Sequence, residues 1–314
     1  MTDTLFLCMN SRMANFKNRR SSSHSSTHSK SQSSGFSSSH SKGAHKTTSR
    51  SNRPANSQKS GGGHPGIGMN KSWRQVAGTH AIRELIQANP KTIKSLVLSK
   101  NWGSSADLRQ IVDQIKPYQV QISEVSDVDL QKMCPSHQGA VAFSDYHPHF
   151  DVLEAGWEQN SMIVALDGVE DPHNLGAVLR TSWLMGVHGV IVPEDRAVGL
   201  TATVHKVACG GVEHVPLAKT NNFADPFKTL KEAGFWVFGM SHKAKKTIHD
   251  LKVPEKVIWV MGAEDKGLRI PTERACDELI SIPQISADAS YNVSVATAIV
   301  LSETRRQWAV HKSK

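Results

Sequence analysis

The chain has 314 residues, enough for two domains of about 100–200 residues each, and 38% of its residues are hydrophobic. Its formal net charge is +9, but the first 72 residues carry +10 and the remainder carries −1. Bulk charge on the folded part is therefore excluded as a basis for nucleic-acid binding, which has to depend on local patches or motifs.

Residues 1–72 are rich in Ser, His, Lys, Arg and Gly and contain few side chains that could bury apolar area. Such a segment does not recover its ordering entropy, so we expect a disordered basic tail. Its charge could attract RNA phosphates, or the tail could serve only for solubility, and composition leaves both open. Gly61, Gly63 and Gly66 match G-x-G-x-x-G, but no strand precedes them and Pro65 interrupts the motif, so we reject a dinucleotide site.

Residues 73–144 predict a small α/β unit. Helices and strands alternate along it, which predicts a parallel-type sheet covered by helices. The expected strands are 95–99, 120–123 and 140–143, and the expected helices are 81–86, 108–115 and 128–133. His80 and His137 are isolated, and we interpret both as surface or structural residues.

Residues 145–160 lack clear periodicity and are predicted to be a linker. His147 and His149 are close in sequence, but no third ligand is evident, so we expect no metal site.

Residues 161–314 predict the larger α/β domain. Expected strands cover 162–166, 189–192, 212–217, 235–238, 257–261 and 279–282, and expected helices cover 175–182, 200–208, 223–233, 271–275 and a long stretch from 293. The near-continuous apolar strands are typical of a buried parallel sheet. Asn292 or Ser290 could cap the final helix.

Four cysteines, none in a C-x-x-C pair, argue against a disulfide framework and a zinc site and favour a reducing compartment. No apolar run of about 18 residues is present, and no positive segment precedes the short apolar run at the N-terminus. We therefore expect a cytoplasmic protein without a membrane span.

Three polar loops, each at the end of an apolar strand, stand out. They are LDGVEDPHNLGAVLRT with Asn174 and Arg180, WVMGAEDKGLR with Gly262 and Glu264, and ISIPQISADASYNVSVA with Ser290 and Asn292. In this order they resemble the three motifs of the SpoU (TrmH-type) family of SPOUT RNA ribose 2'-O-methyltransferases. Residues 77–143 also resemble, more loosely, that family's substrate-binding domain, which is similar to an L30e-type fold.

The resemblance implies a catalytic domain, 161–314, with a deep trefoil knot, preceded by the L30e-like RNA-binding domain, 73–144. It also implies a homodimer and a pocket for S-adenosylmethionine lined by Gly262, Ile282 and Tyr291, with no metal. Where the family often has Leu, this chain has Tyr291, which could reshape the adenine side of the pocket.

By the same resemblance, the catalytic and substrate-ordering residues are Asn174, Arg180, Glu264, Ser290 and Asn292. A guanidinium is a poor base, so we favour a role for Arg180 in binding phosphate and stabilising the alkoxide, and leave direct deprotonation open. Taken singly, the two asparagines could be helix caps, Arg180 a surface residue and Glu264 a turn residue.

The resulting prediction is methyl transfer to a ribose 2'-hydroxyl of rRNA or tRNA, with a guanosine of large-subunit rRNA as the expected target. The alternative is a catalytically inactive RNA-binding or ribosome-assembly protein of the same fold.

Overall fold

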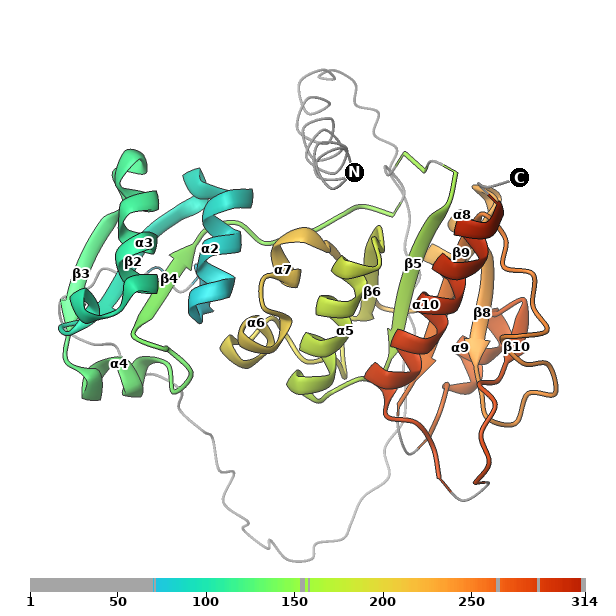
Figure 1. Ribbon diagram of the computed structural model, residues 1–314. Helices are drawn as coiled ribbons and strands as arrows, with labels where there is room; N and C mark the ends of the chain where they lie inside the picture. Colours follow the sequence, from blue (N-terminus) through green and yellow to red (C-terminus); the bar gives the residue numbers. More distant parts are fainter. Residues whose placement is uncertain are drawn as a thin grey trace, which may run out of the picture. The chain divides into compact units, whose positions relative to one another are not determined.

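The computed structural model describes residues 70, 72–152, 156–157, 159–263, 266–286 and 289–311. Residues 1–69 and 71 lie outside it, so the predicted disorder of the tail stays an expectation. The described residues form two β-sheets, each covered by helices (Figure 1). We refer to the sheet β1–β4 with helices α2–α4 as the first lobe, and to the sheet β5–β10 with helices α5–α10 as the second lobe.

The sheet of the first lobe has the strand order β1-β4-β2-β3. Its elements are β1 (Arg74–Ala77), α2 (Thr79–Ala88), β2 (Ile93–Ser99), α3 (Ala106–Ile115), β3 (Gln121–Val125), α4 (Asp127–Met133) and β4 (Ala140–Ser144). The predicted parallel arrangement holds only for β2 and β3, because β4 is antiparallel to both β1 and β2. Helix α4 has seven residues and rises only about 10 Å, so it does not return the chain to the opposite end of the sheet.

Side chains on the strands of the first lobe alternate between two apolar cores. Leu96 and Leu98 of β2 face α2 and α3, whereas Val97 packs with Leu130 of α4. This is the period of two expected for a strand that is buried on both faces. Strand β1 was not predicted, because its four residues are too few to show a period.

The sheet of the second lobe is entirely parallel, with the strand order β10-β8-β9-β5-β6-β7. Its strands are β5 (Ser161–Asp167), β6 (Gly189–Pro193), β7 (Leu217–Thr220), β8 (Trp236–Met240), β9 (Lys256–Gly262) and β10 (Glu278–Ile280). Its helices are α5 (Pro172–Leu184), α6 (Ala202–Ala208), α7 (Gly211–His214), α8 (Ala224–Glu232), α9 (Ile270–Ala275) and α10 (Val293–His311).

Helices cover both faces of this sheet. Val164 and Leu166 of β5 belong to the core that contains residues of α5, α6 and α10, and Ile163 and Ala165 belong to the core that contains residues of α8. Helix α10 packs against β9 and beside α5 (Figure 1). The predicted buried parallel sheet is confirmed.

The expected strand 212–217 is wrong for most of its length. Residues 211–214 form helix α7, and the strand begins only at Leu217. Val212 and Val215 are three residues apart and both are buried, a spacing that suits one face of a helical turn. In so short a run, the helical and extended patterns could not be separated by periodicity alone.

The segment predicted to be a linker takes part in packing. Phe150 is 2% exposed and belongs to the second lobe's core, where its ring lies edge-on to that of Trp157. His149 Nδ1 lies 3.1 Å from the carbonyl oxygen of Leu217, and His147 Nε2 lies 3.1 Å from that of Ser72. These two histidines therefore contact backbone.

Candidate functional site at the carboxyl edge of the second sheet

The three predicted motifs begin at one edge of the second sheet. Strands β10, β8, β9 and β5 are adjacent and parallel, so their carboxyl ends lie together. That edge is where open α/β sheets usually bind ligands. Motif one follows β5, motif two follows β9 and motif three follows β10.

A buried carboxylate joins motif one to motif two. The side chain of Asp167, the last residue of β5, is fully buried and accepts hydrogen bonds from Arg269 N at 2.9 Å and from Arg269 Nε at 2.5 Å. A charged, hydrogen-bonded pair of this kind fixes the return of the motif-two loop to the sheet. Sequence reasoning did not select Asp167 as a site residue, although an acid at the end of an apolar strand was a usable signal.

A pair of asparagines joins motif one to motif three. Asn292 Nδ2 donates to Asn174 Oδ1 at 2.9 Å. Asn292 also caps α10, since its Oδ1 accepts from Ser294 N at 2.9 Å. Asn174 is not a cap, because Asp171 caps α5 by accepting from His173 N. The predicted cap at Asn292 is confirmed, and the same side chain connects two segments 118 residues apart.

The side chain of Arg180 is exposed and points away from this asparagine pair. Its Nη1 donates to Cys209 Sγ at 3.5 Å. Asn174 and Arg180 are six residues apart on α5, which turns them by roughly 240° around the helix axis. Within this chain the two predicted catalytic residues therefore lie on different faces of α5.

Three faces of α5 have different neighbours. Asn174, with Ala177 and Thr181, faces the start of α10 and the groove beside it. Leu175, Val178 and Leu179 lie in the sheet core. Gly176, Arg180 and Trp183 face α6 and α7. Spacings of three and four residues place each set on one side of the helix.

Gly262, which ends β9, packs against its own loop. A Cβ at this position would lie 2.3 Å from Gly267 C and 2.5 Å from Leu268 N. The loop is also closed by paired hydrogen bonds between Ala263 and Gly267, at 3.1 and 2.9 Å. Glu264 lies outside the described residues, so its place is untested.

The remaining predicted donor-pocket residues follow β10. Ile282 is half-buried against the second lobe's core. Ser290 is exposed, as is Tyr291, whose hydroxyl donates to Pro283 O at 3.2 Å. This hydrogen bond closes the 283–291 loop on itself. The loops after β9 and β10 thus offer backbone groups and an apolar side chain, a donor set that suits a nucleoside-like ligand.

An open groove of about 600 Å³ lies beside these loops, between α5 and α10. Its exposed surface is mainly apolar, and its lining mixes apolar and polar residues: Ala177, Thr181, His249, Ser294, Val295, Ala298, Ile299, Ser302 and Glu303. None of the predicted donor-binding residues lines it. The groove is thus distinct from the carboxyl-edge loops, although Ser294 is only two residues from Asn292.

The part of the chain that the structure describes contains neither a metal-binding cluster nor a helix that could span a membrane. No group of three or more His, Cys, Asp or Glu side chains is arranged to hold a metal ion there. Within that same part, no helix combines the length and the apolar character needed to span a bilayer.

Comparison with known sequences agrees with this arrangement. Residues 161–302 match the SpoU rRNA Methylase family, and residues 75–148 match a family described as RNA 2'-O ribose methyltransferase substrate binding. The chain is 37% identical over 246 residues to the 23S rRNA (guanosine-2'-O-)-methyltransferase RlmB of Neisseria meningitidis, a match that covers 77% of this chain and 98% of that protein. It is 40% identical over 238 residues to the protein of the same name from Nitrosomonas europaea, covering 74% and 91% of the two chains.

A solved structure of similar fold is the SpoU methyltransferase AviRb from Streptomyces viridochromogenes in complex with the cofactor AdoMet. Its TM-score is 0.66 at 18% identity, with 76% of this chain and 92% of that chain covered. The structural likeness supports the fold, and the sequence matches cover nearly the full length of the relatives. The chain therefore belongs to the SpoU rRNA methylase family.

Proposed function

We propose that the protein is an S-adenosylmethionine-dependent RNA methyltransferase that modifies a ribose 2'-hydroxyl, with a guanosine of large-subunit rRNA as its target. The observation that carries the proposal is the hydrogen bond between Asn174 and Asn292, which joins motifs one and three at the carboxyl edge. The proposed substrate is the one named for the relatives that align over most of the chain.

The methyl donor supplies an electrophilic methyl group on a sulfonium. The chain's own task is to hold the ribose 2'-oxygen in line with that carbon and to assist departure of the hydroxyl proton. Gly262, Ile282 and Tyr291 are proposed to line the donor site, mainly through backbone groups. Asn174, Asn292, Ser290 and Glu264 are proposed to orient the ribose and the loops around it.

Arg180 is proposed to bind the phosphate of the target nucleotide and to stabilise the developing alkoxide. Its guanidinium is exposed and is bound only weakly, to a thiol, which leaves its other donors for RNA. Direct deprotonation by Arg180 is less favourable, because a guanidinium holds its proton at physiological pH.

We infer that a second copy of the chain covers the groove between α5 and α10. The exposed surface of the groove is mainly apolar, although His249 and Glu303 also line it, and Val295 in it is 47% exposed. Ala177 and Thr181 line it from the face of α5 that carries Asn174, so a partner seated there would lie next to the asparagine pair. Val295→Asp should convert a dimer to monomers in sedimentation equilibrium, and an unchanged dimer would contradict this interface.

A trefoil knot is proposed for the C-terminal segment. After β10, residue 281 passes alongside the loop that joins β8 to β9: Ser281 N donates to Lys246 O and Ile248 N donates to Ser281 O, both at 2.9 Å. Helix α10 then returns to pack beside α5. This course is compatible with threading through a loop, a topology that is rare in proteins.

The domain assignment follows the same proposal. Residues 1–72 would be a basic tail, and residues 73–144 would bind RNA as an L30e-like domain. Residues 145–160 would connect that domain to the catalytic domain, residues 161–314. An enzyme that modifies rRNA has to meet ribosomal precursors, so we place it in the cytoplasm.

The test is transfer of labelled methyl groups to large-subunit rRNA, followed by mapping of the 2'-O-methyl site. Arg180→Ala should reduce transfer at least 100-fold while leaving thermal unfolding unchanged. Arg274→Ala, at an exposed position on α9, is the matched control and should retain activity. A protein that binds no donor in calorimetric titration and methylates neither rRNA nor tRNA would instead be an inactive RNA-binding relative.

A further inference from the structure

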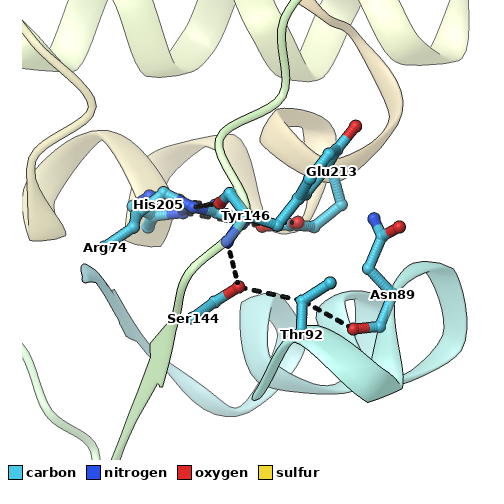
Figure 2. Close-up of polar contacts among 7 residues, drawn as sticks. All are labelled: Arg74, Asn89, Thr92, Ser144, Tyr146, His205 and Glu213. Carbon is cyan, nitrogen blue, oxygen red and sulfur yellow. Dashed lines mark hydrogen bonds and ion pairs between the residues drawn. The ribbon is translucent and has the colours of Figure 1, made fainter. Parts of the chain in front are cut away.

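A buried ion pair connects the first lobe to the second. Arg74 of β1 donates from Nη1 and Nη2 to the two carboxylate oxygens of Glu213 on α7, at 2.6 and 2.9 Å (Figure 2). Arg74 and Glu213 are 4% and 1% exposed. His205 of α6 is equally buried, with its ring nitrogens 3.3 and 3.5 Å from Arg74 Nη1. Separating the lobes would leave both charges without their partner.

The same cluster continues into the end of the first sheet. Arg74 Nε donates to Tyr146 O at 2.9 Å, and Tyr146 N donates to Ser144 Oγ at 3.1 Å. Ser144 in turn donates to Thr92 Oγ1 at 2.9 Å (Figure 2). A row of hydrogen bonds thus connects the ion pair to β4 of the first lobe and to Thr92, the residue before β2.

A second contact joins the lobes through the next residue of α7. His214 Nε2 lies 2.8 Å from Glu84 Oε2 on α2. The His214 ring stacks on Trp183 of α5, with ring centroids 4.3 Å apart and planes 4° apart. The first lobe therefore contacts, through one histidine, the helix that carries Arg180.

The turn between α6 and α7 contacts Arg180 directly. Cys209 Sγ accepts the hydrogen bond from Arg180 Nη1, and a Cβ on Gly211 would lie 2.7 Å from Leu179 O and 3.0 Å from Arg180 Cα. Only glycine permits so close an approach of this turn to α5. Any displacement of the turn would therefore move either the backbone or the guanidinium of Arg180.

We propose that Glu84, Glu213 and His214 are positioning residues that fix the RNA-binding lobe relative to Arg180. A bidentate arginine–carboxylate pair defines orientation as well as distance. Buried as it is here, the pair disfavours an open arrangement in which one lobe swings free. The RNA-binding lobe and Arg180 would then keep a fixed distance and orientation relative to each other. The expected effect on RNA methylation rests on the proposed function, whereas the docking of the two lobes does not.

The kinetic test uses the full-length protein and Glu84→Gln, with Asp107→Asn as the matched control. Asp107 pairs with Arg83 inside the first lobe and is exposed, so its substitution breaks an ion pair without affecting the contact between lobes. Glu84→Gln should lower kcat/KM for rRNA about tenfold, or shift the methylated nucleotide, with donor affinity within twofold. Asp107→Asn should leave all of these within twofold. A Glu84→Gln enzyme with wild-type kinetics and site choice would overturn the proposal.

Docking itself is tested without RNA by amide hydrogen exchange in Glu213→Gln. Residues 74–77 of β1 should exchange at least tenfold faster than in the wild type, while the β2 amides of 93–99 stay protected. Equal protection of both strands would overturn the docking. Faster β1 exchange in a protein that methylates no RNA would support the docking and refute the proposed function.

Discussion

Replacing Gly262 by alanine tests the proposed donor site most directly. The new methyl carbon would lie 2.3 Å from Gly267 C and 2.6 Å from Gly267 O, so the loop after β9 has to move by about 1 Å to reach ordinary contact. The atoms in the way are backbone atoms, and no side-chain rotation can relieve the contact. Overpacking of this kind costs about 1–3 kcal/mol.

Two measurements decide the outcome of Gly262→Ala. Donor affinity, measured by calorimetric titration, should fall at least tenfold, because the displaced backbone groups are those proposed to contact the donor. Urea unfolding should show a loss of about 1–3 kcal/mol. Gly199→Ala is the control, since a Cβ there meets nothing within 4 Å and should change stability by less than about 0.5 kcal/mol. Unchanged donor affinity in Gly262→Ala would refute the reasoning.

Three further predictions concern the asparagine pair and two titrating groups. Asn292→Ala should cost about 1 kcal/mol of stability, because the helix cap is lost, and should also weaken methyl transfer. Asn292→Ser keeps a capping oxygen and should restore the stability but not the transfer. If both variants transferred methyl groups as fast as the wild type, the contact with Asn174 would have no role in the reaction. Burial, followed by the charge of Arg74, lowers the pKa of His205 well below 6.5, so its stabilising contribution is present above pH 6.5 and is lost as the pH falls below that value. His205→Gln should remove up to about 1.4 kcal/mol per pH unit from the slope of unfolding free energy between pH 6.5 and 5. The hydrogen bond from Arg306 lowers the pKa of Glu303 from 4.5 to about 2, so the contribution of Glu303 to folding stability is present above pH 4.5 and is lost towards pH 2. In Glu303→Gln, the urea midpoint of unfolding should therefore vary less with pH across that range than in the wild type.

The local sequence pattern was sufficient to predict most helices and strands of the second lobe. The apolar runs of β5 and β9 are long enough to identify buried parallel strands, and α10 begins directly after Asn292, one of the two residues expected to cap it. Where the run was short, the pattern failed, as in 211–214, because a single helical turn and a strand share the same few apolar positions. The strand at 140–143 was predicted, but its antiparallel direction was not, because strand direction depends on where the connecting chain re-enters the sheet.

The candidate site, like the fold, was predicted from the sequence only in part. The motifs predicted which loops would lie at one edge, but not that Asn174 and Asn292 would bond each other, since 118 residues separate them. Arg74 and Glu213 gave no sequence signal either. Each looks like an ordinary surface charge in its own segment, and only the packing of two lobes makes them a buried pair.

Helix α5 relates these observations to one another. Its thirteen residues present one face to α10, one to the sheet and one to the turn between α6 and α7. A rigid helix transmits a shift at any face to the other two, so the asparagine pair, the proposed subunit interface and the interlobe contacts all influence the same arginine. Substitutions on different faces, such as Asn292→Ala and Glu84→Gln, should therefore give non-additive losses of methyl transfer in a double-mutant cycle. Strict additivity would mean that α5 does not couple them.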